Sequence, residues 1–153
     1  MEKLSAAYIV VATAGIGLAI YVTNEYLTQN FNSCNINAVF SCGGVYQSGY
    51  TSLFGIPFYL MGLVWFPVAF TLGLFTSRFG ERPVKSEILL PFLTVGNIFT
   101  GYLWYLELAV IHIICPLCVS LYVVNYVLTF IVLLQLLREP NISSDGVEPK
   151  TVN

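Results

Sequence analysis

Cys115-Pro116-Leu117-Cys118 stands at the head of the last long apolar run of the chain, which extends to Leu137. Pro116 has no backbone N–H and a fixed φ, so it suits the first position of a helix. Cys115 is then expected at or near the helix N-cap, with Cys118 one turn inside on the same face. The positive end of the helix dipole favours the reactive thiolate there. This stretch therefore indicates a redox-active dithiol at the mouth of a membrane helix.

The composition of the 153-residue chain is that of a membrane protein. Charged residues make up 9% and hydrophobic residues 57%, whereas about 25% of the residues in a soluble domain are charged. The length leaves room for one domain. A net charge of −2 and a sequence pI near 5.2, without a basic stripe, argue against a nucleic-acid partner.

Four apolar segments are long enough to cross a membrane, which takes about 20 residues per helix. We expect them at residues 4–24, 53–77, 88–106 and 115–137. The first is long for a cleaved signal peptide and lacks its small-residue exit. Pro57 is expected to kink the second span, because membrane helices tolerate proline. The predicted fold class is an all-α membrane protein, a four-transmembrane-helix bundle with a cysteine loop between its first two helices.

The segments between and after the spans are polar. Residues 26–52 are rich in Asn, Ser, Gly, Gln and Thr and predict a loop, with a short interfacial helix near residues 37–40. Residues 107–114 are expected to form a brief connection. The polar residues 140–153 predict a disordered tail after a domain at 1–139.

The basic residues predict the topology, because all of them fall on one side of a four-span chain. They are Lys3, Arg78, Arg82, Lys85, Arg138 and Lys150. The positive-inside rule places this side, with both termini, in the cytoplasm. Both cysteine pairs then share the extracytoplasmic side, where disulfides persist.

The loop pair Cys34 and Cys42 must fold back to form a disulfide. Eight residues of straight helix span about 12 Å, whereas the Cα atoms of a disulfide lie about 4.4–6.8 Å apart. Gly43 and Gly44 permit such a turn. A dithiol in a mobile loop that faces a second dithiol can pass a disulfide to it by thiolate attack. Two structural disulfides and a four-cysteine zinc site are the alternatives, and an oxidising compartment disfavours zinc capture.

A set of motifs extends over residues 4–137. It consists of Cys34-x7-Cys42, Ser48, Ser52-Leu53-Phe54-Gly55-Ile56-Pro57-Phe58-Tyr59, Cys115-Pro116-Leu117-Cys118 and Tyr122. In this spacing the chain resembles the vitamin K epoxide reductase family, and more closely its prokaryotic disulfide-forming branch. The resemblance implies a four-helix membrane bundle that holds a quinone of ubiquinone or menaquinone type beside the C-x-x-C pair, with no metal.

The resemblance also implies roles for the cysteines. Cys34 and Cys42 would take electrons from a separate thioredoxin-like partner, because this chain ends too early to carry such a domain. Cys115 would exchange with the loop, with Cys42 as its counterpart, and Cys118 would lie nearest the quinone ring. A prokaryotic cell membrane is favoured over the endoplasmic reticulum.

The remaining site residues are assigned to quinone binding. Tyr122 matches a tyrosine that hydrogen-bonds one quinone oxygen. Thr51 stands where vertebrate members have the asparagine that bonds the other oxygen, and this difference disfavours vitamin K epoxide as substrate. The other expected members of the pocket are Tyr46, Ser48, Phe54 and Phe58.

The predicted function is that of a membrane thiol:quinone oxidoreductase that generates disulfides. A vitamin K epoxide or quinone reductase of an endomembrane, and a structural membrane protein with two inert disulfides, are the alternatives. Glu107 is a functional candidate by its location near a membrane surface. Asn97 is interpreted as an interhelical hydrogen-bonding residue, and His112 as an interfacial histidine without a role.

Overall fold

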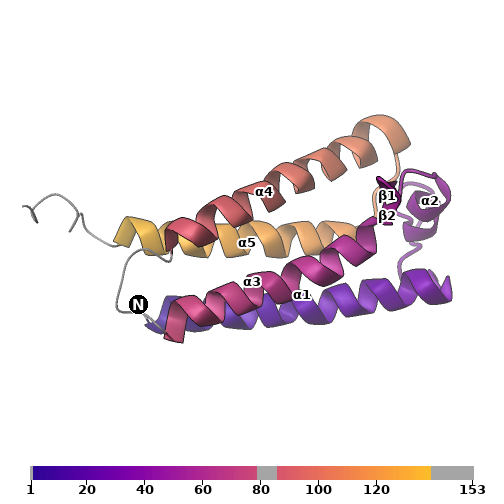
Figure 1. Ribbon diagram of the computed structural model, residues 1–153. Coiled ribbons are helices and arrows are strands. Elements are labelled where there is room, and N and C mark those ends of the chain that lie inside the picture. The colour runs from indigo at the N-terminus through magenta and orange to yellow at the C-terminus, as the bar shows by residue number, and fades with distance from the viewer. Residues whose placement is uncertain (1, 79–85, 139–153) are drawn as a thin grey trace, which may run out of the picture.

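Four long helices form an elongated bundle in the computed structural model, which describes residues 2–78 and 86–138 (Figure 1). They are α1 (Glu2–Thr28), α3 (Phe58–Arg78), α4 (Ser86–Tyr105) and α5 (Pro116–Arg138). All four are long and apolar enough to cross a membrane, as the sequence predicts. The tail expected at 140–153 and most of the basic turn before α4 lie outside the described residues.

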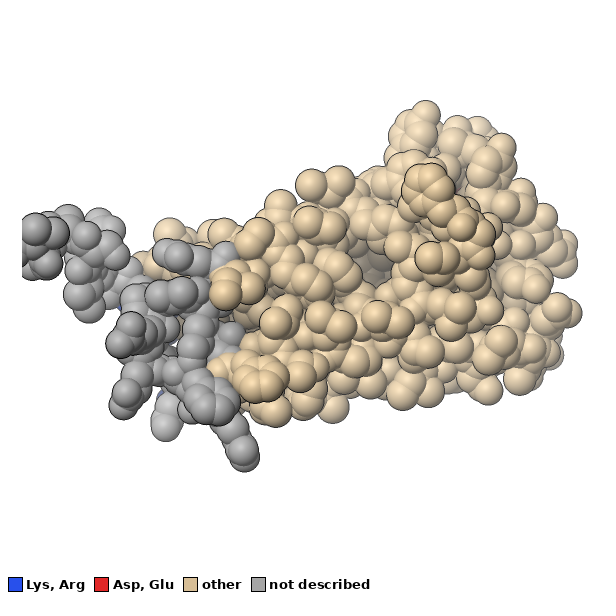
Figure 2. Space-filling model, in the orientation of Figure 1, with Lys and Arg blue, Asp and Glu red and all other residues tan. Residues whose placement is uncertain are grey.

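The bundle is held by apolar packing, with α1 against α3 and α5, and α5 also against α4. Its core contains small residues such as Ala12 and Ala19 beside larger ones such as Phe66, Leu93 and Leu128. Other large apolar side chains point outward, and the helices on the face in Figure 2 present uncharged side chains. Such a surface suits lipid, where each helix satisfies its own backbone hydrogen bonds.

A chain of polar side chains links three of the helices inside the bundle. The Trp65 indole N–H donates to Asn125 Oδ1 (3.1 Å), and Asn125 Nδ2 donates to Asn97 Oδ1 (2.8 Å). Asn97 Nδ2 in turn donates to Thr129 Oγ1 (2.9 Å). These contacts confirm the interhelical role predicted for Asn97, because buried amides in lipid require partners.

The second span begins later than predicted. Residues 52–57 form a two-stranded antiparallel hairpin, β1 (Ser52–Leu53) and β2 (Ile56–Pro57), whose turn has positive φ at Phe54 (53°) and Gly55 (82°). Positive φ at both central residues is the geometry of a tight hairpin turn. The prediction of a helical kink at Pro57 is therefore wrong, since α3 starts only at Phe58.

The two connections at the loop end also differ from expectation. The predicted helix at residues 37–40 is replaced by a turn, in which Asn37 Oδ1 accepts the N–H groups of Val39 and Phe40 (both 2.9 Å). The short helix instead follows as α2 (Cys42–Gln47), with Ser41 as its N-cap. On the other side, α4 continues as the π-helix η2 (Leu106–Ile111), so residues 107–111 are helical rather than a connection.

Two glycines of α4 provide a matched test of this packing. A Cβ atom at Gly96 would lie 2.9 Å from Trp65 Cε2 and 3.1 Å from Asn125 Oδ1, whereas a Cβ at Gly101 would meet nothing within 4 Å. The Trp65 ring cannot move freely, because it stacks on Phe92 with the ring centroids 4.0 Å apart.

We expect Gly96→Ala to lower the free energy of unfolding by about 1–3 kcal/mol through overpacking. Gly101→Ala should change it by no more than about 0.5 kcal/mol, as is usual for exposed positions. Thermal unfolding of the detergent-solubilised protein measures both. Equal losses for the two variants would contradict the packing described for α4.

Candidate functional site

The four cysteines form two disulfides at the same end of the bundle. Cys34 pairs with Cys42 across a Cα–Cα distance of 5.6 Å, and Cys115 pairs with Cys118 across 5.2 Å. The loop folds back as expected, because the N–H groups of Cys34 and Asn35 both donate to the carbonyl of Phe31 (3.0 and 2.9 Å) and close a turn. The predicted pairing within each pair is thus present.

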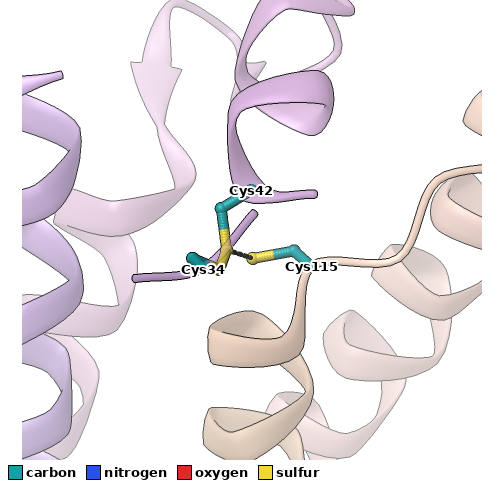
Figure 3. Close-up of side chains that lie close together, drawn as sticks. All are labelled: Cys34, Cys42 and Cys115. Atoms are coloured by element: carbon teal, nitrogen blue, oxygen red, sulfur yellow. Dashed lines mark hydrogen bonds between the residues drawn. A yellow bond between two sulfur atoms is a disulfide. The ribbon is translucent and has the colours of Figure 1, made fainter. Parts of the chain in front are cut away.

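The two disulfides meet through Cys42 and Cys115, whose sulfur atoms lie 3.2 Å apart (Figure 3). The sulfur of Cys34 completes a cluster in which the three sulfur atoms lie within 4.8 Å of one another. Cys34, Cys42 and Cys115 are 2%, 0% and 0% exposed. Sulfurs in contact and shielded from water are placed for direct thiol–disulfide exchange, whereas a metal would require free thiolates.

Backbone hydrogen bonds hold the cysteine loop against the segment that precedes α5. Phe40 and Ile114 form an isolated parallel bridge. The N–H of Ser41 donates to the carbonyl of Ile114 (3.0 Å), and the N–H of Ile114 donates to the carbonyl of Val39 (2.7 Å). Because Ser41 and Ile114 directly precede Cys42 and Cys115, this bridge fixes the approach of the two sulfurs.

Asn35 and a glycine allow the loop to close tightly. Asn35 Oδ1 accepts the Ser41 hydroxyl (2.9 Å) and the Gly43 N–H (3.1 Å). A Cβ atom at Gly44 would lie 3.0 Å from Ile113 Cδ1, so the absence of a side chain there lets α2 approach the α5 entrance. The sequence offers no signal that singles out Asn35 among the polar residues of the loop.

The N-terminus of α5 has the geometry predicted for Pro116 at the first helical position. The carbonyl of Cys115 accepts the N–H of Val119 (3.0 Å), which makes Cys115 the N-cap. The Cys115 sulfur also accepts the backbone N–H of Cys118 (3.2 Å). An N–H group aimed at a sulfur, together with the positive end of the helix dipole, stabilises negative charge on that sulfur when the disulfide is reduced.

A cavity of about 70 Å³ lies beside the second disulfide, and the face in Figure 2 is hollowed between α3 and α4 toward the loop end. The residues with polar groups that line the cavity include Thr51, Glu107, Cys118 and Tyr122, and its aromatic residues include Tyr26 and Phe58. Thr51, Phe58 and Tyr122 therefore lie where the sequence analysis expects quinone-binding residues.

Three of the expected pocket residues do not line this cavity. Phe54 is 96% exposed at the tip of the hairpin. Tyr46 packs in an aromatic cluster with Tyr26 and Phe31, with ring centroids 5.6 and 5.4 Å away. Ser48 caps the end of α2, where its hydroxyl donates to the carbonyl of Val45 (2.6 Å). The hairpin, which the sequence analysis does not predict, and α2, which begins later than the short helix expected near residues 37–40, direct these side chains elsewhere.

Glu107 contacts both the helix disulfide and a residue that lines the cavity, which its position in the sequence does not indicate. The Tyr122 hydroxyl donates to Glu107 Oε1 (2.8 Å), and the Cys115 N–H donates to Glu107 Oε2 (3.3 Å). The Tyr26 hydroxyl, which also lines the cavity, lies 3.9 Å from the Cys118 sulfur. The sequence signal for Glu107 is that it is the only acidic residue between Glu87 and Glu139, whereas nothing distinguishes Tyr26 from the nine other tyrosines.

The chemistry of the cavity fits a quinone ring. Its walls are mostly aliphatic and aromatic, and they include the hydroxyl groups of Thr51 and Tyr122, of which the Tyr122 hydroxyl donates to Glu107 in the described arrangement. Ligand pockets are built in this way, but they typically have volumes of roughly 300–1,000 Å³. A ring can therefore enter the space of about 70 Å³ only if side chains or the hairpin move aside.

The fold and the site together define a multi-pass membrane protein with two disulfides that face each other at one end of its bundle. The model of the vitamin K epoxide reductase family matches residues 6–133, and the chain belongs to this family. Members of the family are membrane oxidoreductases that use quinones as electron acceptors. A comparison with curated proteins gives no significant match.

Trapping the exchange partners tests the sulfur geometry. In a Cys34→Ser/Cys118→Ser variant, only Cys42 and Cys115 are left, and we expect them to oxidise to a disulfide because their sulfurs are 3.2 Å apart. The Cys34→Ser/Cys115→Ser variant leaves Cys42 and Cys118. Because the Cys118 sulfur is not part of the three-sulfur cluster, these two thiols should form a disulfide far more slowly. Alkylation followed by mass spectrometry counts the free thiols over time. Similar rates for both variants would show that the loop does not keep the described position.

Proposed function

We propose that this protein is a thiol:quinone oxidoreductase that generates disulfides. Electrons pass from a separate thioredoxin-like protein to Cys34/Cys42, then to Cys115/Cys118, and finally to a membrane quinone of ubiquinone or menaquinone type. The observation that carries the proposal is the 3.2 Å contact between the Cys42 and Cys115 sulfurs, together with the position of Cys118 at the cavity.

The contact favours one order of bond exchange. When the loop pair is reduced, the Cys42 thiolate attacks the Cys115 sulfur, forms the Cys42–Cys115 disulfide and releases Cys118 as a thiolate. Cys34 then attacks Cys42, restores the loop disulfide and frees Cys115. Two electrons have moved from the loop pair to the helix pair. Attack at Cys115 thus releases the one cysteine of the four that lines the cavity.

The residues around the cavity support the final transfer. A bound quinone supplies an acceptor for two electrons and two protons. Cys118, which lines the cavity, would pass the electrons to the bound quinone, and Cys115 would close the disulfide with Cys118 as they leave. The hydroxyl of Thr51, and that of Tyr122 once it turns from Glu107, would orient the ring and stabilise negative charge on its oxygens, which is the usual role of hydrogen-bond donors at such a site.

The distribution of charge supports an orientation in the membrane. In the sequence, every Lys and Arg lies before or at the start of the first span, between the second and third spans, or after the fourth. The positive-inside rule then puts both termini in the cytoplasm and both disulfides on the extracytoplasmic side. An oxidising compartment there, and Thr51 in place of an asparagine, favour a disulfide-forming role in a prokaryotic cell membrane over reduction of vitamin K epoxide.

Quinol formation by the purified protein tests the proposed route. With a reduced thioredoxin-like protein as donor, wild type should turn over, and both Cys118→Ser and Cys34→Ser should be inactive. With a small dithiol that reaches the helix pair directly, Cys34→Ser should regain activity, while Cys118→Ser stays inactive. The absorbance change of the quinone on reduction gives the rates.

The same variants distinguish this function from that of a structural membrane protein with two inert disulfides. If no quinone is reduced by wild type and the two disulfides resist mild dithiol, the cysteines are structural. If Cys34→Ser is inactive even with the small dithiol, the assigned order of the two pairs is wrong.

A further inference from the structure

Glu107 is a buried acid in a helix of the membrane-spanning bundle. Its side chain is 3% exposed. Lys3 and Arg138 belong to the first turn of α1 and the last turn of α5, which lie at the end of the bundle away from α2 and the hairpin (Figure 1), so neither lies beside Glu107 to compensate its charge. Acidic residues inside a membrane protein are costly, and they commonly mark proton relays or ligand sites.

The two carboxyl oxygens of Glu107 connect both parts of the redox site. Oε2 accepts the backbone N–H of Cys115 (3.3 Å), which belongs to the helix disulfide. Oε1 accepts the hydroxyl of Tyr122 (2.8 Å), which lines the cavity. A single ionisable group therefore connects the dithiol, which releases protons on oxidation, with the Tyr122 hydroxyl, which lines the cavity.

The π-helix accounts for the position of Glu107. In η2 the backbone is wider than in an α-helix, and both Leu106 and Glu107 are buried. The segment ends at His112 in the left-handed conformation, with φ of 57°. Short π-helical turns are rare and occur frequently at functional sites, because the extra residue shifts the side chains relative to those of the preceding turns.

The structure assigns to Glu107 the role of proton carrier between the Cys115/Cys118 pair and the cavity; this inference rests on the proposed function. As Cys115 and Cys118 join in a disulfide, two electrons leave the sulfurs and two thiol protons are released. Glu107 takes up one of these protons. Tyr122 would donate its hydroxyl proton to one quinone oxygen and recover a proton from Glu107, while the Cys118 thiol, which lines the cavity, would give the second proton directly to the quinone, so that dithiol plus quinone gives disulfide plus quinol.

The groups around Glu107 are few. The ionisable side chains that line the cavity with it come from the neighbouring helices and the segment before α3. They are Tyr26, Tyr50, Cys118, Tyr59 and Tyr122. Glu107 carries the one carboxyl group among the residues that line this cavity. It is therefore the one lining residue that can carry a proton on a carboxyl group.

The kinetic test compares Glu107→Gln, Glu107→Asp and a control. Glutamine keeps the shape of the side chain but cannot release a proton, so quinol formation at saturating quinone should fall about 100-fold, in the range typical for loss of an acid–base group. Disulfide exchange between Cys42 and Cys115 and the KM for quinone should stay near wild type. Glu107→Asp should restore part of the rate. Glu25→Gln, the same change at the other buried acid among the described residues, should not lower it.

An infrared difference spectrum, reduced minus oxidised and without quinone, provides a readout that does not depend on turnover. Wild type and Glu25→Gln should show a carboxylic-acid carbonyl band that changes with the redox state of the cysteines, and Glu107→Gln should lack it.

The outcomes separate the two proposals. A wild-type rate in Glu107→Gln, or a parallel loss of exchange, quinol formation and thermal stability, would overturn the proton-carrier role and make Glu107 dispensable or merely structural. Absence of quinol formation by wild type, with the carboxyl band still present and lost in Glu107→Gln, would instead refute the proposed function while leaving the coupling of Glu107 to the cysteines in place.

Discussion

The short parallel bridge between Phe40 and Ile114 is the constraint on which the site depends. The two cysteine pairs are separated by more than 70 residues, and they sit on a loop and on a helix entrance that share no regular element. The bridge pairs the residues just before Cys42 and Cys115. Because each sulfur is only one or two residues from a backbone hydrogen bond, the geometry of the exchange is set by the backbone rather than by flexible side chains.

The first turn of α5 also shapes the site, because it places its two cysteines in different surroundings. Cys115 caps the helix and is fully buried against the loop, whereas Cys118 lies one turn further on and lines the cavity. The spacing of three residues keeps the sulfurs close enough to form a disulfide on one helix face. One helical turn thus connects a buried site for disulfide exchange with the mostly apolar cavity that Cys118 lines.

Much of this architecture can be predicted from the sequence, and the exceptions have physical reasons. Length and hydropathy determine the four spans, and Pro116 determines where α5 starts. The start of α3 was predicted too early because the apolar residues of the hairpin look like the beginning of a span, while the turn depends on positive φ at Phe54, which few side chains adopt. The bridge to Ile114 and the contacts of Glu107 join distant segments, so no local pattern encodes them. The assigned quinone-binding roles of Thr51 and Tyr122 are still predictions.

The burial of the loop disulfide bears on how a partner could reach it. With Cys34 and Cys42 at 2% and 0% exposure, a thioredoxin-like protein cannot attack either sulfur in the described arrangement, which instead suits transfer within the chain. Delivery of electrons from outside therefore requires the loop to leave Ile114. The two backbone hydrogen bonds of the bridge contribute about 1–3 kcal/mol together, at roughly 0.5–1.5 kcal/mol each. Under the proposed function, the loop would have to give up these two hydrogen bonds and the apolar packing that buries Cys34, Cys42 and Val45 before a protein donor could reach its disulfide.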